Sequence, residues 1–332
     1  MSSALVGLTA VLASLVLSML VIRAGHRLKL LHHPGPGRVH SSPVVRLGGL
    51  AIMPAFLLAM ALGGGDFEAF GGVYIGVVLI TGIGLVDDLF GMRPALKLAG
   101  QTAVALTAVS LGVRISVISN PFGGVIELDI AVGGAMTVFW LVGMMNAVNL
   151  LDGLDGLAPG VVLVSAVILA VLSSQLGNEP LLLFGLALAG AIAGFLPLNA
   201  YRARLILGDS GSNVLGFLIG CMAVLGQAKI GTTLLVLGIP ILDVAWTLIR
   251  RRLSGRSITA RDTEHLHHRL LQFGLSKYQV TMVYVALCTA FGAAALLLDR
   301  AEKLFGLAAL TGVTALLLFL GAKKTPNKDQ SK

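Results

Sequence analysis

Long apolar stretches, separated by short polar segments, run along the chain from residue 4 to residue 321. A helix that spans a bilayer needs about 20 predominantly apolar residues, with some tolerance in length. On this criterion the pattern predicts eleven spanning helices, of which the second and the eighth are short. Their approximate ranges are 4–22, 48–63, 71–86, 96–112, 131–150, 160–177, 180–198, 213–226, 230–249, 279–298 and 304–321. The predicted fold is therefore that of an all-α polytopic membrane protein.

The composition places the whole chain in the membrane class. Hydrophobic residues make up 56% and charged residues 12% of the 332 residues, whereas soluble domains carry about 25% charged residues. No long polar stretch remains for a second domain, so residues 1–332 are predicted to form one membrane domain with a cytoplasmic tail over 322–332. The first apolar stretch lacks a preceding basic region, which favours a membrane helix over a signal peptide.

The basic residues predict the orientation of the chain. If the N-terminus lies outside, 20 of the 24 Lys and Arg residues fall in cytoplasmic segments, and the outside segments hold only Arg114, Lys229, Arg300 and Lys303. This bias is what the positive-inside rule describes, and it makes the C-terminus cytoplasmic. The net charge of +8 then follows from topology and from attraction to anionic headgroups, so it predicts no nucleic-acid partner.

One outside segment, 113–130, predicts a small non-helical structure. Asn120-Pro121 and Gly123-Gly124 are turn signals, and the alternating residues of 125–129 are typical of a short strand. We expect a turn followed by a hairpin strand here, with a structural role.

Five carboxylates gather at the predicted cytoplasmic ends of three helices: Asp87, Asp88, Asp152, Asp155 and Asp209. The positive-inside rule does not explain acidic residues, so this clustering needs a separate cause. Adjacent carboxylates at a membrane boundary repel each other and are partly desolvated. The Asp87-Asp88 pair is therefore expected to hold a cation or to share a proton, the alternative being a solvated helix terminus.

A second motif predicts a polar stripe. Asn146, Asn149, Asp152 and Asp155 recur every three positions, so they would share one face if the helix continued through them. The glycines that follow Asp152 and Asp155 allow tight turns or the close approach of a ligand. The alternative for the stripe is hydrogen bonding between helices.

A third motif, 208–213, reads Gly-Asp-Ser-Gly-Ser-Asn at the start of an apolar helix. Small residues with free amides at a helix N-terminus form an anion site, and a carboxylate in the same turn suits a Mg²⁺ ion that bridges to the anion. Gly208 and Ser212 are therefore candidate phosphate-binding residues. Ser212 is equally a candidate N-cap.

A fourth motif, His265-Leu266-His267-His268-Arg269, lies in the most basic cytoplasmic loop. No cysteine or separate acidic triad lies near it in sequence, which argues against zinc and favours phosphate binding or proton handling. His265 and His268 would share a face if this loop is helical.

Further basic residues could meet a phosphate or anchor a lipid headgroup. They are Arg38, His40, Arg46 and Lys97. Asp243 lies inside a helix end, where we expect a structural partner such as the 250–252 arginine cluster, with membership of the site as the alternative.

All four motifs fall on the cytoplasmic side under a topology derived from Lys and Arg alone. Carboxylates for a divalent cation, cationic side chains and glycine-rich amides suit phosphoryl transfer, which is mostly positioning and electrostatic stabilisation. No G-x-x-x-x-G-K-[ST] loop is present, so an ATPase has little support. A site at the membrane indicates a lipid reactant.

Four ordered segments, 84–97, 146–158, 199–217 and 265–271, resemble the signatures of the polyprenyl-phosphate N-acetylhexosamine-1-phosphate transferases of glycosyltransferase family 4. This family includes the MraY enzyme of peptidoglycan synthesis and the WecA and TagO initiators of surface polysaccharides. The resemblance covers residues 23–278, and the His-x-His-His form is similar to the WecA/TagO branch. It implies a multi-pass enzyme of the bacterial inner membrane with its active site at the cytoplasmic face.

The resemblance also implies a reaction. Undecaprenyl phosphate would attack the β-phosphate of UDP-N-acetylglucosamine or a close relative, UMP would leave, and Mg²⁺, or Mn²⁺ in its place, would be required. By motif, Asp209 would ligate the metal. Asp87 would be the base or activator at the lipid phosphate, and Asp88 would support it and share the metal.

The remaining roles implied by the resemblance concern the two substrates. Asn149, Asp152 and Asp155 would lie along the nucleotide site, with Asn199 nearby. The three histidines 265, 267 and 268, followed by Arg269, would face the sugar or the diphosphate. Lys97 would meet a phosphate. The resemblance is also compatible with a homodimer.

Two departures weigh against an MraY-type muramyl-pentapeptide donor. In MraY-type relatives an aromatic residue precedes the Gly-Asp pair and stacks on uracil, whereas residues 205–207 are Leu-Ile-Leu here. Arg46 stands before Gly48-Gly49, where MraY-type relatives have a lysine. Other UDP-N-acetylhexosamines remain alternative donors. Outside the enzyme class, the alternative is an ion-coupled transporter, whose carboxylates would lie nearer the bilayer midplane.

The predicted topology has a direct test. A reporter fused after residue 260 should read as cytoplasmic, because seven of the basic residues lie between 250 and 278. A fusion after residue 120 should read as external. A periplasmic signal from the first fusion would overturn the orientation and the side assigned to the site.

Overall fold

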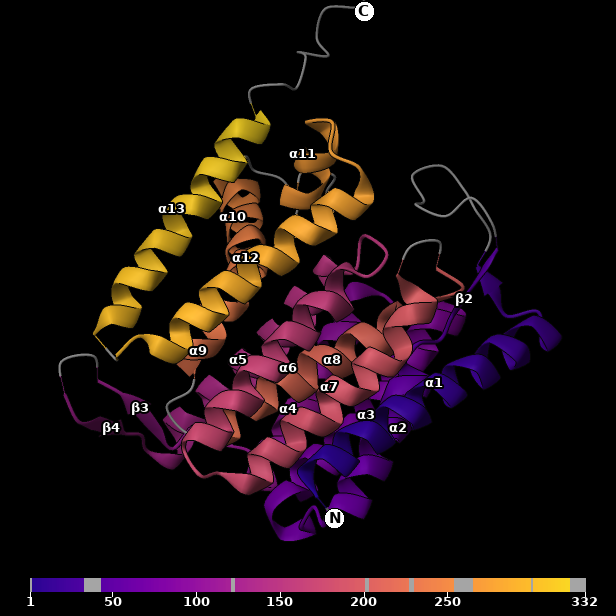
Figure 1. The fold of residues 1–332 in the computed structure, drawn as a ribbon, viewed down its shortest axis with the longest axis horizontal. Helices are drawn as coiled ribbons and strands as arrows, with labels where there is room; N and C mark the ends of the chain where they lie inside the picture. The colour runs from indigo at the N-terminus through magenta and orange to yellow at the C-terminus, as the bar shows by residue number, and fades with distance from the viewer. Residues whose placement is uncertain are drawn as a thin grey trace, which may run out of the picture.

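The structure, a computed structural model, describes residues 2–32, 43–120, 123–200, 203–226, 230–253, 265–299 and 301–322. Within these ranges the chain is mostly helical (Figure 1). The helices are α1 (Ser3–Arg27), α2 (Gly49–Gly63), α3 (Phe67–Phe90), α4 (Pro94–Ser110), α5 (Ile130–Leu151), α6 (Leu157–Gln175), α7 (Glu179–Asn199), α8 (Gly208–Leu225), α9 (Ile230–Val236), α10 (Gly238–Leu253), α11 (Leu266–Gln272), α12 (Lys277–Leu297) and α13 (Glu302–Ala322). The all-α prediction therefore holds for the bulk of the fold.

Seven helices in the described ranges are long and apolar enough to cross a membrane. They are α1, α3, α5, α6, α7, α8 and α12, and each overlaps one of the predicted spans. Helix α2 is apolar but has only 15 residues. The chain is thus a multi-pass membrane protein, and the exact count of eleven spans remains a prediction.

One predicted span is wrong as a continuous helix. The range 230–249 is divided into α9 and α10, which are separated at Leu237. Pro240 lies in the first turn of α10 and has no backbone N–H to donate to Val236, so the hydrogen-bond ladder of α9 cannot run through it.

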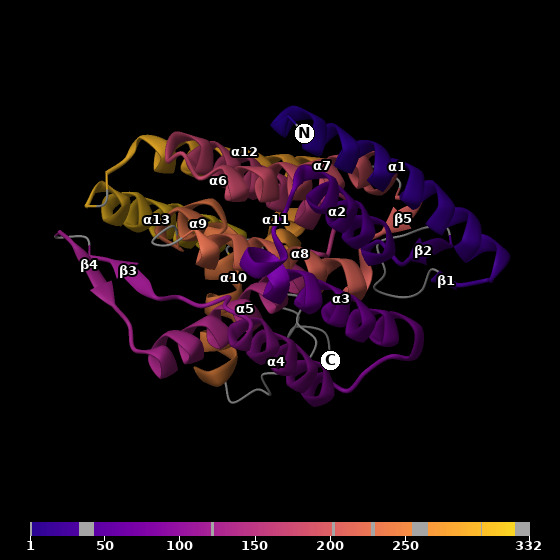
Figure 2. The same cartoon turned by 90° about the horizontal axis from the view of Figure 1, so that it is seen from below.

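Helix α8 forms the centre of the fold. Every residue from Gly208 to Val224 is buried, and α8 packs against α2, α3, α5, α6 and α7. Figure 2 shows α8 between α1, α2 and α7 on one side and α3, α4 and α5 on the other. By contrast, α1 exposes leucines such as Leu8 and Leu12, as expected for a helix that faces lipid.

Five short strands form two small sheets. Strand β1 (Leu31–His32) pairs antiparallel with β2 (Val44–Arg46), which pairs parallel with β5 (Leu205–Ile206). The predicted hairpin is confirmed by β3 (Val117–Ser119) and β4 (Val125–Glu127), which are antiparallel. Figure 1 places the two sheets at opposite ends of the bundle. The sequence pattern did not predict the β1–β2–β5 sheet.

The turn between α3 and α4 brings two predicted site residues together. Gly91, with φ +71°, ends α3, and Pro94 begins α4. Pro is well suited to the first helical position because that position needs no N–H donor. The connection is so short that Lys97, in the first turns of α4, lies beside Asp87 in the last turn of α3.

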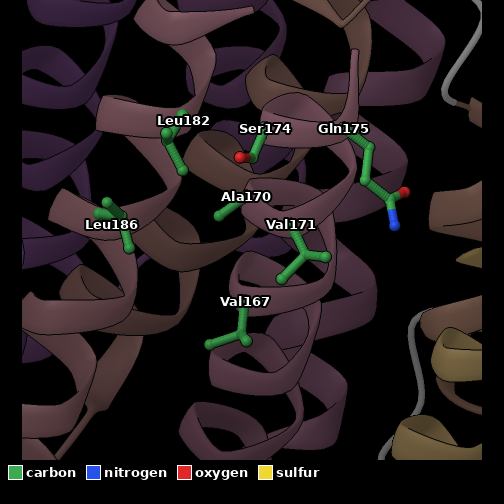
Figure 3. Close-up of a pocket in the computed structure, with 7 residues that line it drawn as sticks. All are labelled: Val167, Ala170, Val171, Ser174, Gln175, Leu182 and Leu186. Atoms are coloured by element: carbon green, nitrogen blue, oxygen red, sulfur yellow. The ribbon is translucent and has the colours of Figure 1, made fainter. Parts of the chain in front are cut away.

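A shallow apolar groove of about 280 Å³ lies between α6 and α7 (Figure 3). It is lined by Val167, Ala170, Val171, Ser174, Gln175, Leu182 and Leu186. These residues belong to the second half of α6 and the first half of α7. The groove is therefore remote from the carboxylates, which lie at the opposite ends of these helices.

The packing of α3 on α8 yields a matched pair of variants. A Cβ atom added to Gly84 would lie 2.7 Å from the backbone nitrogen of Ser210, whereas one added to Gly82 meets nothing within 4 Å. Gly84→Ala should therefore destabilise the protein by about 1–3 kcal/mol and reduce activity. Gly82→Ala, on the same helix, should be neutral. Thermal unfolding in detergent measures both, and equal melting temperatures would contradict the packing described.

Candidate active site

Asp209, in the first turn of α8, is the centre of an ion cluster. Its carboxylate forms ion pairs with Lys97 of α4 and with Arg46 of β2. The side-chain amide of Asn149, on α5, donates to the same carboxylate at 2.7 Å. The pairing of β2 with β5 explains the position of Arg46, because β5 leads directly into α8. Four elements from distant parts of the sequence therefore meet at one carboxylate.

The ammonium group of Lys97 lies among oxygen atoms from three helices. It contacts Asp87 Oδ2 at 3.1 Å, Asn149 Oδ1 at 3.4 Å and the carboxylate of Asp209. These oxygens are mostly shielded from solvent, since the side chains of Asp87 and Asp209 are only 12% and 11% exposed. The cluster therefore forms an oxygen-lined position that already holds one positive charge.

The side chain of Asp88 is fully buried and points toward the first turn of α8. Its Oδ1 and Oδ2 accept the backbone N–H groups of Asp209 and Ser210 at 2.7 and 2.9 Å, and its carboxylate pairs with Arg46 at 3.2 Å. Gly208 has φ +70°, and a Cβ there would lie 2.7 Å from Asp88 Oδ2. Glycine at 208 therefore permits the close approach of Asp88 to the N-terminus of α8.

The predicted anion site at the start of α8 consequently needs a correction. The free amides that would receive a phosphate already bind the carboxylate of Asp88. Ser212 is not an N-cap, because α8 begins at Gly208 and the Ser212 hydroxyl donates to the Gly208 carbonyl within the helix. Ser212 also accepts from Asn149, so it helps to orient that amide.

The predicted polar stripe does not continue through its four members. Helix α5 ends at Leu151, so Asp152 and Asp155 lie in the loop that leads to α6. Asn149 reaches Asp209, whereas Asn146 lies one turn deeper and donates to Gln101. The glycines of this loop favour turn conformations over helix, which explains why the helical repeat stops.

The loop after α5 is fixed by its neighbours. Asp155 accepts the N–H of Ala203 at 3.3 Å. Asn199 is buried, accepts the N–H of Gly156 and donates to the carbonyl of Leu205. Sequence reasoning assigned Asn199 to the substrate, whereas here it ties the loop to the segment that precedes α8.

Asp152 lies near the ion cluster, and its environment affects its protonation. Burial raises the pKa of the Asp152 carboxyl well above its usual range. The positive charge of Arg46 opposes this rise, and the negative charges of Asp209 and Asp88 add to it. Asp152 is therefore more readily protonated than an ordinary aspartate.

The histidine motif is held by Asp243 of α10. Asp243 pairs with His265 Nδ1 at 3.3 Å and accepts the N–H of Leu266, the first residue of α11, at 2.8 Å. Both side chains are almost fully buried. Asp243 is therefore in contact with the predicted site through His265, which agrees with the second of the two alternatives considered for it.

His267 is buried against the loop that follows α5. A Cβ on Gly153 would lie 2.6 Å from His267 Nε2, so the ring packs directly on that glycine. Burial lowers the pKa of His267 to about 3, with smaller contributions from His268 and His265. His267 is thus neutral at physiological pH, and its contact with Gly153 joins the histidine motif to the carboxylate loop.

The other predicted residues have varied positions. Arg38 and His40 lie outside the described residues. The ring of His268 lies 4.2 Å from that of His267, and Arg269 lies in α11.

Gln101 and Asn213 were not predicted, although each occurs four residues after a predicted site residue on the same helix face.

The residues at the cluster fit a magnesium ion. Among the residues that the structure describes, no three His, Cys, Asp or Glu side chains group into a metal site made by protein alone. Mg²⁺, however, is usually held by one or two carboxylates together with water and substrate phosphates. The carboxylates of Asp87 and Asp209 and the amide oxygen of Asn149 are hard oxygen donors around a position that already accepts a cation.

Comparison with known proteins agrees with this geometry. Residues 70–227 match glycosyl transferase family 4. The decaprenyl-phosphate N-acetylglucosaminephosphotransferase of Mycobacterium leprae (strain TN) is 34% identical over 96% of this chain and 90% of the relative. The chain belongs to glycosyl transferase family 4. It is an enzyme of the polyprenyl-phosphate sugar-phosphate transferase type, which sets aside the transporter alternative.

Two further relatives are similar to this chain over most of its length. The undecaprenyl-phosphate alpha-N-acetylglucosaminyl 1-phosphate transferase of Thermotoga maritima is 28% identical over 88% of both chains. The phospho-N-acetylmuramoyl-pentapeptide-transferase of Anoxybacillus flavithermus is 31% identical over 83% of this chain and 91% of the relative. The resemblance inferred from the four motifs is thus confirmed at the level of the family.

The two adjacent aspartates should differ in their effect on stability. Asp88→Asn turns one acceptor oxygen into a donor that faces a backbone N–H, so the free energy of unfolding should fall by about 1–3 kcal/mol. Asp87→Asn keeps an oxygen for the N–H of Met92 and should change stability much less. Both variants should lose turnover. Thermal unfolding and activity assays test this, and equal melting temperatures would contradict the positioning role of Asp88.

Proposed function

We propose that the protein transfers N-acetylhexosamine-1-phosphate, most simply N-acetylglucosamine-1-phosphate, from a UDP-sugar to undecaprenyl phosphate. An oxygen of the lipid phosphate attacks the β-phosphorus of the UDP-sugar, the bond between that phosphorus and the bridging oxygen breaks, and UMP leaves. The product is a lipid-linked diphosphate sugar that starts a cell-surface polysaccharide. The position shared by Lys97, Asp87, Asp209 and Asn149 carries this proposal, together with family membership.

Lys97 and Arg46 supply the positive charge that this reaction requires. Phosphoryl transfer depends on the neutralisation of negative oxygens, and little covalent chemistry is asked of the protein. Both cations are now paired with carboxylates, and Arg46 is the more exposed, at 34% of its side chain. When the diphosphate enters, these two side chains can exchange carboxylate oxygens for phosphate oxygens without moving far.

Asp87 is the residue best placed to orient the attacking phosphate. Its carboxylate lies at the end of α3 beside Lys97, next to the oxygens of the cluster. A phosphate monoester is already largely ionised at neutral pH, because its second pKa is about 6. Asp87 therefore acts mainly by position and charge, and it accepts a proton only from the protonated fraction of the acceptor.

Asp209, with Asp87 and Asn149 beside it, would hold Mg²⁺ or Mn²⁺. The metal would supply charge neutralisation at the diphosphate. Asp88 keeps both oxygens on α8 amides, so its contribution is to hold the first turn of α8 in place.

The predicted topology indicates the membrane location and the orientation of the chain. We place the eleven spans in the bacterial inner membrane with the N-terminus outside, the C-terminus in the cytoplasm and the site at the cytoplasmic face. This orientation rests on the distribution of Lys and Arg. The acceptor is a polyprenyl phosphate of the kind named for the relatives, which include decaprenyl and undecaprenyl enzymes.

An N-acetylglucosamine donor is favoured over the muramyl-pentapeptide donor. Leu205 and Leu207 are fully buried and offer no aromatic face to uracil. Arg46, which stands where MraY-type relatives have a lysine, pairs with both Asp88 and Asp209. The relative from Mycobacterium leprae, which matches over 96% of this chain, is named for N-acetylglucosamine.

The function can be tested by UMP release from detergent-purified protein. With Mg²⁺ and undecaprenyl phosphate present, one UDP-N-acetylhexosamine from a panel should give UMP release that depends on the lipid. Decaprenyl phosphate, tested beside it, reports on acceptor length. No release from any donor by protein that unfolds cooperatively would refute the proposed reaction.

Asp209→Asn tests the metal assignment. Loss of a central carboxylate should reduce turnover by about 100-fold or more, and the residual activity should depend less on Mg²⁺. Asp129→Asn is the matched control, because Asp129 caps the far end of α5 and Asn caps helices equally well. An Asp209→Asn enzyme with normal activity and an unchanged Mg²⁺ profile would refute Asp209 as a ligand.

A further inference from the structure

A second polar layer lies one helical turn deeper than the ion cluster. The upper layer has one residue from each of α4, α5 and α8, and the lower layer has one more from each of the same helices. The upper residues are Lys97, Asn149 and Asp209, and the lower residues are Gln101, Asn146 and Asn213. All three lower residues are uncharged amides.

The lower amides form a continuous chain of hydrogen bonds. Asn146 Nδ2 donates to Gln101 Oε1 at 2.8 Å, and Gln101 Nε2 donates to Asn213 Oδ1 at 2.7 Å. Asn213 Nδ2 then donates to the backbone carbonyl of Asp209 at 2.6 Å. Gln101 is fully buried and Asn213 is 1% exposed. Within this lower layer, Gln101 thus joins α5 to α8, and it belongs to the helix that carries Lys97.

Such a chain sets the register of the three helices. Buried amides inside an apolar bundle have no water to replace a lost partner, so a shift of one helix along another would leave polar groups unsatisfied. Hydrogen bonds between side chains are a recurrent way to join helices in membranes. Because Lys97 lies one turn above Gln101, a shift of α4 would move its ammonium away from Asp209 and Asp87.

The chemistry of glutamine suits this place. Its amide accepts from one helix with its oxygen and donates to another with its nitrogen. Methionine has a similar length and shape but can do neither. Lys97 and Asp209 need accurate placement, because catalytic groups lose most of their effect when their support loosens by about 1 Å.

We propose that Gln101 is a positioning residue of the transferase, which holds α4 in register with α5 and α8 so that Lys97 and Asp209 meet. The proposal rests on the proposed function for the identity of the reaction, but the register of the helices does not depend on the donor.

Gln101→Met is the first test, with Gln175→Met as the matched control at the exposed end of α6. Mn²⁺ binding, followed by electron paramagnetic resonance without substrates, should weaken about tenfold for Gln101→Met. UMP release should fall by at least the same factor through kcat. The control should match the wild type in both. Wild-type Mn²⁺ affinity and kcat in Gln101→Met would overturn the proposal.

Gln101→Glu provides a second test in case the methionine variant does not fold. A protonated carboxyl can donate to Asn213 and accept from Asn146 as the amide does, whereas an ionised carboxyl cannot donate. The activity of Gln101→Glu relative to the wild type should therefore be close to one at pH 6, where burial favours the protonated carboxyl, and should not rise with pH. A ratio well below one at pH 6, or one that rises with pH, would overturn the proposal. If the wild type itself releases no UMP, the proposed reaction fails, and the Mn²⁺ measurement still decides the role of Gln101.

Discussion

Charged groups at the end of a membrane bundle must find partners in the protein, because partial removal from water penalises each isolated charge. Here the constraint is met at the first turn of α8. Asp209 is paired with Lys97 and Arg46, Asp87 with Lys97, and Asp88 with two backbone amides. The pairings of Asp209 and Asp88 join α8 to β2, α4 and α3, and the pairing of Asp87 with Lys97 joins α3 to α4. The same interactions that make the charges tolerable therefore bring β2, α3, α4 and α5 together around one carboxylate.

The hydrophobic pattern predicted most of the helices, because a span of apolar residues can satisfy its backbone in lipid only as a helix. The hydrophobic pattern failed where a single residue or a contact between distant segments determined the structure. Pro240 interrupts an apolar range that otherwise reads as one span, and the division into α9 and α10 follows. The pairing of β2 with β5 joins residues about 160 positions apart, and no periodicity in either segment reports such a contact.

The residues of the candidate site were found from their chemical type, but their partners were not. Carboxylates at helix ends were conspicuous, so Asp87, Asp88 and Asp209 could be named from the sequence. The direction in which each points depends on the neighbouring helix. Asp88 and Asp87 are adjacent in sequence, yet one caps α8 and the other faces Lys97. Gln101 carries no charge and lies inside an apolar helix, so only the three-dimensional contacts with Asn146 and Asn213 distinguish it.

The capping of α8 by Asp88 has a consequence for how the proposed diphosphate substrate would be bound. In many phosphate-binding folds, a glycine-rich turn presents free amides and the positive end of a helix dipole to the ligand. In this protein a carboxylate of the chain itself already occupies that end of α8. In the proposed reaction, the diphosphate would therefore be recognised by the side chains of Lys97 and Arg46 and by a metal, all of which can exchange their partners. Such a site can release a charged product more readily than a rigid cradle of backbone amides, which suits the proposed return of a lipid diphosphate to the membrane.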